Sequence, residues 1–85
     1  MGDRLYSATG ASFRYLIECM EDLKHPIGYS EWYDQTTRRW NLMLNITYNY
    51  ELICSKRLSS QDITTLYNQA NEWLSKQVRE LRDWK

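Results

Sequence analysis

Few side chains in this sequence of 85 residues are suited to covalent or acid–base chemistry. His25 is its single histidine, and its cysteines are Cys19 and Cys54. A cysteine next to a histidine in space forms a nucleophilic pair. His25, however, precedes a proline at the end of a predicted helix, where we expect it to act as a C-terminal cap. We therefore expect no catalytic pair of this kind.

The two thiols are too few for a disulfide framework and are not grouped with histidines as zinc ligands would be. We expect both to be reduced, as in a cytoplasmic protein. Cys54 falls in the inward register of a predicted strand, so we expect it to be buried and inert. Cys19 lies beside the apolar stripe of a predicted helix and is expected to be half-buried.

Paired carboxylates are the other candidates for chemistry. Glu18, Glu21 and Asp22 lie close together on a predicted helix, but His25 is expected to cap that helix, and we expect no further carboxylate beside them to complete a metal or acid–base site. We interpret them as a solvated acidic face. The three glycines are scattered and begin no phosphate-binding loop. The sequence therefore predicts a protein that is not an enzyme and that binds no cofactor or metal.

Two basic pairs bracket the aromatic middle of the chain: Arg38 with Arg39, and Lys56 with Arg57. Cations interleaved with aromatic rings on a sheet are typical of proteins that bind single-stranded nucleic acid. The same charges would also solubilise strand ends and block pairing between sheet edges. The 11 basic and 11 acidic residues cancel, so the whole chain has no long-range attraction to nucleic acid. Nucleic-acid binding by these four residues is our alternative hypothesis.

The first element that must position these residues is a helix predicted over residues 11–24. Apolar residues recur there at three- and four-residue intervals and share one face. Thr9 or Ser12 is expected to cap its start. His25-Pro26 is expected to end it, because proline disfavours helical geometry in the preceding residue.

The period then changes from 3.6 to 2. Apolar side chains occupy every second position from Trp40 to Cys54, which predicts strand structure. One straight strand of that length would extend about 50 Å, too far for a small domain. The run must either bend at a bulge or turn, and Asn49 is the best turn residue within it. A preceding strand over residues 29–33 would pair with it through the polar connection 34–37.

The last element is predicted to be a long amphipathic helix from Asp62 to Trp84. Ser59 with Asp62 resembles a capping box at its start. Its apolar stripe continues through Val78, Leu81 and Trp84. A small sheet would not reach this far, so we expect the end to be covered by the N-terminal segment, a second copy of the chain or another protein.

Together these elements predict a single α+β domain over residues 1–85, of order α-β-β-(β)-α, with an antiparallel sheet packed on the N-terminal and C-terminal helices. This order resembles the double-stranded-RNA-binding domain in topology alone. That family begins its final helix with a lysine cluster that grips phosphates, whereas the segment here is Ser59-Ser60-Gln61-Asp62. The resemblance therefore implies the fold and does not carry RNA binding.

Aromatic residues make up 14% of the chain, more than one small core needs. A sheet covered by helices on one face leaves Trp32, Met43 and Ile53 on the other face. Tryptophan, tyrosine and arginine are common anchors of protein interfaces. The candidate contact residues are Trp32, Tyr33, Arg38, Arg39, Met43, Leu81 and Trp84.

We therefore expect a non-enzymatic interaction domain, a small regulator or inhibitor of the kind that phages encode, which docks on a larger protein. Self-association as a homodimer is a further possibility. The N-terminus has no apolar segment typical of a signal peptide, and no run approaches the ~20 apolar residues of a membrane span. We expect a cytoplasmic protein with no membrane partner.

Overall fold

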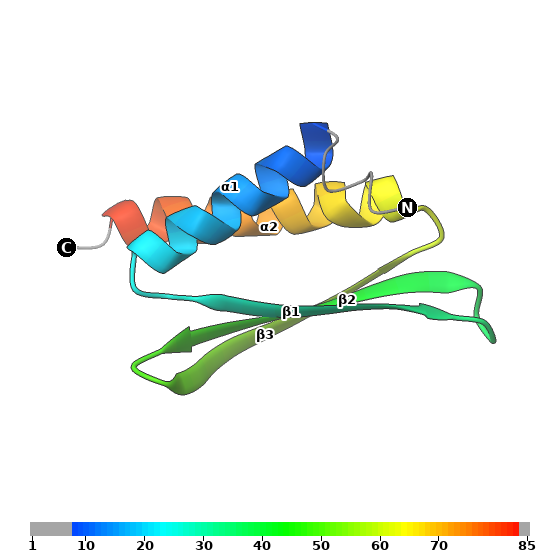
Figure 1. Ribbon diagram of the computed structural model, residues 1–85, viewed down its shortest axis with the longest axis horizontal. Coiled ribbons are helices and arrows are strands. Elements are labelled where there is room, and N and C mark those ends of the chain that lie inside the picture. Colours follow the sequence, from blue (N-terminus) through cyan, green and yellow to red (C-terminus); the bar gives the residue numbers. More distant parts are fainter. Residues whose placement is uncertain (1–7, 84–85) are drawn as a thin grey trace.

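The structure is a computed structural model that describes residues 8–83. Their elements follow the order α1 (Ala8–Asp22), β1 (Ile27–Asp34), β2 (Arg39–Tyr48), β3 (Glu51–Ser60) and α2 (Ile63–Asp83). Figure 1 shows α1 and α2 together on one face of the sheet, both running toward the end at which β2 turns into β3. The predicted α+β order is confirmed, with the long ladder divided into separate strands.

The sheet is an antiparallel meander of order β1-β2-β3. Because β2 is paired on both sides, its side chains form the centre of the molecule. Leu42, Leu44 and Ile46 on β2 face the helices and are almost completely buried. The domain measures 43 × 26 × 18 Å, a thin and elongated shape that follows from a single sheet covered on one side.

The end of α1 is capped by its own backbone. The N–H of His25 donates to the carbonyl of Met20 at 2.8 Å, and Lys24 has a φ of 66°, the left-handed conformation of a Schellman cap. His25 Nδ1 donates to the carbonyl of Leu23 at 2.8 Å, so the expected capping role is confirmed. The helix includes Ala8, which places Thr9 inside it.

Ser12 likewise lies inside α1, so neither predicted N-cap residue caps the helix. The prediction placed the start too late because the apolar stripe begins at Phe13, whereas the regular backbone starts before the first buried side chain. The connection from β1 to β2 is held by Asp34, whose carboxylate accepts hydrogen bonds from the N–H groups of Thr36 and Thr37.

The ladder turns at Asn49, as predicted. Tyr48 and Glu51 are paired, so Asn49 and Tyr50 form a two-residue turn. Their φ angles are 53° and 67°, and positive φ at both central residues defines a type I′ hairpin. An irregularity in register also follows Ile46: Cys54 lies opposite Ile46, whereas Leu52 lies opposite Thr47, which leaves Ile53 as the extra residue of a β-bulge.

The bulge and the turn make part of the predicted inward register wrong. Leu52 lies opposite Thr47 on the face away from the helices, and its side chain is 62% exposed. Cys54 remains on the helix-facing side opposite Ile46, but it is exposed rather than buried. Burial in β3 begins only at Leu58, because the helices cover the central strand and the C-terminal end of β3.

The start of α2 is capped by Asp62. Its Oδ2 accepts hydrogen bonds from the N–H and the hydroxyl of Thr65, both at 2.9 Å. The predicted capping box with Ser59 is wrong, because Ser59 belongs to β3. The neighbouring Ser60 hydroxyl accepts from the N–H of Asp62 at 3.2 Å and so fixes the cap residue itself.

The C-terminal part of α2 is covered from within the chain. Val78 is 4% exposed and lies beside Leu16 and Cys19 of α1. Cys19 is therefore buried rather than half-buried. Helix α1 covers Val78, whereas we expected the N-terminal segment, a second copy of the chain or another protein at this end; the N-terminal segment and Trp84 lie outside the described residues. Near the other end, the Phe13 ring makes edge contacts with Tyr29 and Tyr67.

We expect Asp62→Ala to lower the free energy of unfolding by about 1 to 2 kcal/mol, because the Thr65 N–H would lose its capping acceptor at the start of α2. Urea denaturation followed by circular dichroism measures the change. Gln61→Ala, one residue earlier and also exposed, is the matched control and should stay within about 0.5 kcal/mol of the parent. Equal effects of the two substitutions would contradict the cap assignment.

Candidate protein-binding surfaces

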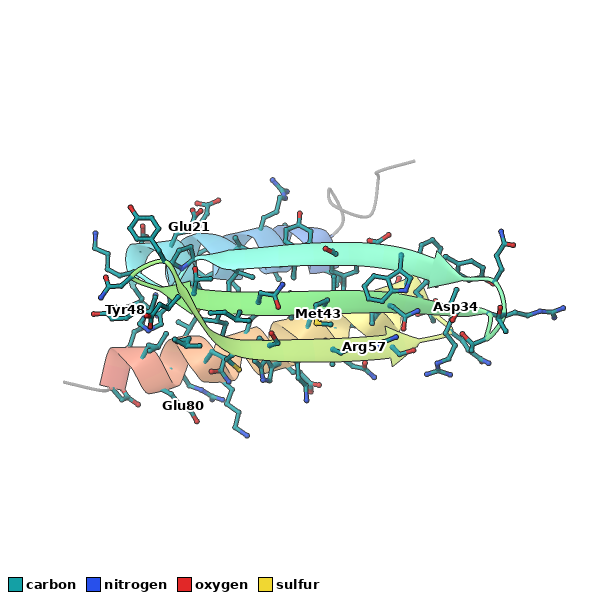
Figure 2. All side chains as sticks on the ribbon, turned by 90° about the horizontal axis from the view of Figure 1, so that it is seen from below. Glu21, Asp34, Met43, Tyr48, Arg57 and Glu80 are labelled. Atoms are coloured by element: carbon teal, nitrogen blue, oxygen red, sulfur yellow. The ribbon has the colours of Figure 1, made fainter. Side chains whose placement is uncertain are left out.

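The face of the sheet away from the helices carries an aromatic and cationic patch. The register places Trp32 of β1 beside Asn41 of β2, and Arg57 of β3 beside Met43 of β2. The Arg57 guanidinium carbon lies 5.4 Å from the centre of the Trp32 ring, a cation–π contact that crosses the central strand. Figure 2 shows Met43 and Arg57 on this face, with the helices behind the sheet.

A buried polar residue, Asn41, lies beside this contact. Asn41 is 4% exposed although it lies on the face that no helix covers. Its amide nitrogen donates to the carbonyl of Arg39 at 3.2 Å. The Arg39 guanidinium in turn donates to the hydroxyl and the carbonyl of Ser59, at 2.9 and 3.2 Å. We call Trp32, Arg39, Met43 and Arg57 the outer-face patch. The contacts described above hold the side chains of Trp32, Arg39 and Arg57 in place.

A second exposed surface lies at the β2–β3 hairpin. The side chain of Tyr50 is 105% exposed, and Tyr48, Leu52 and Ile53 are also exposed. We call these four residues the hairpin tip. Ile53 was expected on the uncovered face of the sheet. The exposure of Tyr48, Tyr50 and Leu52 was not expected, because one continuous alternation assigns them to inward positions. Counting the register separately on each side of Asn49, with positive φ expected there, would have found the change.

A cavity of about 520 Å³ lies beside the hairpin tip. Its wall consists of His25, Tyr48, Gln77, Glu80 and Leu81. The His25 and Tyr48 rings are stacked, with 4.7 Å between their centres. Leu81 is thus half-buried in the wall of a hollow rather than on an open surface. Figure 2 places Tyr48 and Glu80 at the same end of the molecule.

The predicted contact residues do not form one surface. Trp32, Arg39 and Met43 come together in the outer-face patch. Tyr33 lies opposite Trp40, which makes a tilted ring contact with it at 5.0 Å, and so it is on the helix-facing side. Leu81 is at the opposite end. Trp84 lies outside the described residues.

The basic pairs are also divided between faces. Arg39 and Arg57 are on the outer face, whereas Lys56 lies opposite Leu44 on the helix-facing side. Arg38 is exposed in the β1–β2 turn, where its φ is 58°. Among residues 8–83, no three His, Cys, Asp or Glu side chains gather as metal ligands would. No helix within that range is long and apolar enough to cross a membrane.

The sequence of this chain matches a known protein family. The model of the family "Bacteriophage T7-like, gene 1.2" matches residues 1–85. The chain belongs to this family. It is also 31% identical over 83 residues to the "Inhibitor of dGTPase" of Escherichia phage T7, an alignment that covers 96% of this chain and 98% of the relative.

The T7-like gene 1.2 family confirms the functional class inferred from the sequence. A phage inhibitor of an enzyme is a regulator, and it acts on another protein. The prediction of a small phage-encoded regulator or inhibitor is therefore confirmed.

We expect the Trp32–Arg57 contact to contribute about 0.5 to 1 kcal/mol to stability, the range of cation–π pairs at exposed sites. A double-mutant cycle with Trp32→Ala and Arg57→Ala, measured by urea denaturation, should give a coupling energy of this size. The matched cycle with Trp32→Ala and Lys56→Ala should be additive, because Lys56 is on the other face of the sheet. Additivity in both cycles would show that the contact does not stabilise the domain.

Proposed function

We propose that this protein inhibits a dGTPase by binding it, and that it catalyses no reaction itself. The observation that carries the proposal is the 31% identity to the inhibitor of dGTPase, because that alignment covers both chains almost from end to end. The two proteins are therefore compared over the same whole domain rather than over a local motif. Deoxynucleoside triphosphates are cytoplasmic metabolites, so we propose that the protein acts in the cytoplasm.

We propose the outer-face patch as the main contact surface. Tryptophan, methionine and arginine are enriched in protein interfaces, and Trp32 and Arg57 are already ordered by their contact with each other. Order before binding reduces the entropy lost on association. A standard interface buries about 800 Å² on each partner. A sheet face in a molecule of 43 × 26 Å has room for it.

Of the remaining predicted contact residues, Arg38 extends this surface in our proposal. Arg38 lies in the turn that follows β1, at the same end of the sheet as Arg39. Tyr33 and Leu81 lie outside the patch and would contact a partner only if it wraps around the domain. Nucleic-acid binding through the basic pairs remains the alternative. It is disfavoured because Lys56 lies on the opposite face and Arg39 is hydrogen-bonded to Ser59.

We expect the purified protein to inhibit hydrolysis of dGTP when it is titrated into a bacterial dGTPase, and to form a stable complex with the enzyme in size-exclusion chromatography. Neither inhibition nor a complex at micromolar concentrations of both proteins would contradict the proposed function. Light scattering on the inhibitor alone tests the predicted homodimer in the same preparation. A filter-binding assay with single-stranded DNA at low salt tests the alternative.

We expect Trp32→Ala to weaken the complex at least about tenfold, because truncation of an aromatic anchor removes a large apolar contact. Isothermal titration calorimetry measures the change in Kd. Tyr15→Ala is the control: Tyr15 is an exposed aromatic residue on α1, remote from the sheet face, and its truncation should leave Kd unchanged. If Tyr15→Ala weakens binding and Trp32→Ala does not, the contact surface is the helical face instead.

A further inference from the structure

Charged side chains are divided unequally between the two faces of the sheet. The register places Arg39, Arg57 and Asp34 on the outer face. Both glutamates of the strands, Glu31 and Glu51, lie on the helix-facing side. The outer face of the strands therefore carries two guanidinium groups and one carboxylate.

The carboxylate of this face is engaged by the turn next to it. Asp34 Oδ1 accepts hydrogen bonds from the N–H groups of Thr36 and Thr37, at 2.9 and 3.4 Å. Arg38, exposed in the same turn, adds a positive charge at the edge of the face. The outer face thus has a net positive charge, and its one negative group holds the β1–β2 turn.

The two arginines of the face are ordered and still have hydrogen-bond donors to offer. The contact of Arg57 with the Trp32 ring is a cation–π contact, and within residues 8–83 its guanidinium makes no hydrogen bond. Arg39 donates to Ser59 through Nε and Nη2, and its Nη1 group makes no hydrogen bond within the same range. A guanidinium has five N–H donors in a planar fork that fits the two oxygens of a carboxylate.

A single aromatic ring accompanies these cations. Trp32 is on the outer face and 37% exposed, whereas the other rings of the three strands, Tyr29, Tyr33, Trp40 and Tyr48, are on the helix-facing side. Proteins that hold single-stranded nucleic acid stack successive bases on several rings. One tryptophan beside an arginine is instead typical of the centre of a protein interface.

We propose that the outer-face patch binds a carboxylate-bearing surface of the dGTPase, with Arg57 forming the main charge-assisted hydrogen bonds; this inference rests on the proposed function. The partner surface has aspartate or glutamate side chains around an apolar area that contacts Trp32 and Met43. The Trp32 contact orders the Arg57 guanidinium before binding, so little side-chain entropy is lost when it pairs with a carboxylate. The apolar contacts exclude water from the pair and strengthen it.

The first test uses the parent protein and immobilised dGTPase in biolayer interferometry. Surfaces of opposite charge attract each other before contact, so the association rate constant should fall at least about fivefold between about 0.02 M and about 0.5 M NaCl. A rate constant that does not change with salt would overturn the inference, while inhibition of the enzyme would still support the proposed function. A parent protein that neither binds nor inhibits would contradict both.

Arg57→Gln removes the charge and the planar fork together. We expect Kd to rise at least about tenfold at low salt and the difference from the parent to shrink at high salt. Arg57→Lys keeps the charge but not the two parallel hydrogen bonds, and its Kd should lie between those of the parent and Arg57→Gln. Arg79→Gln removes the same charge from the exposed side of α2 and should bind as the parent does. A Kd equal to that of the parent for Arg57→Gln, shown to be folded by circular dichroism, would overturn the inference.

Arg38→Glu tests the sign of the partner surface without disturbing either ordered arginine. Reversal of this exposed charge should lower the association rate constant at least about threefold at low salt. Faster association of this variant would show that the partner surface is cationic and would overturn the inference. Glu72→Lys reverses a charge on the exposed side of α2 and is the control, with no change expected. Single-stranded DNA that displaces the enzyme from the parent protein at low salt would assign the face to phosphates instead.

Discussion

Leu42, Leu44 and Ile46 on the central strand are covered by α1 and α2 on one side of the sheet, and the opposite side of the same strand faces solvent. This one-sided burial underlies the rest of the structure. A thin domain has little interior, so its outer face must be stabilised by contacts across the strands themselves. The Trp32–Arg57 contact and the Arg39–Ser59 hydrogen bonds serve this purpose. They also leave an ordered aromatic and cationic surface, which we propose as the contact surface for the partner.

The same constraint explains the two ends of the molecule. The helices run in the same direction, so both of their C-termini lie at the β2–β3 hairpin (Figure 1). The helices cover little of the β2–β3 hairpin, so its side chains are exposed. The exposed tyrosine, leucine and isoleucine side chains of the hairpin tip are not part of the hydrophobic core. An inhibitor built in this way presents different chemistry at its outer face and at its tip.

Much of the architecture follows from periodicity in the chain. The stripe of apolar residues in α2 and the alternation from Trp40 onward were sufficient to predict the order of elements, and Asn49 was correctly identified as the turn. Cap residues were predicted less well. Thr9 and Ser12 lie inside α1, and Asp62 caps α2 without Ser59, because a cap depends on where the backbone leaves regular geometry rather than on residue type alone. Of the predicted contact residues, Trp32, Arg39 and Met43 lie together on the outer face, whereas Tyr33 and Leu81 lie elsewhere.

The amino-acid order alone determined that this chain forms an α+β domain with an apolar face on each element, because the periods of 3.6 and 2 are local properties of helix and strand. It did not determine which residues of those faces are covered. Alternation predicted that Leu52 and Cys54 point inward. A type I′ turn and a bulge place Leu52 on the outer face, and Cys54, although on the helix-facing side, is exposed because the helices leave the N-terminal part of β3 open. Burial depends on the positions of segments distant in the chain. Only the packed structure could therefore show that Tyr50 and its neighbours form an exposed tip.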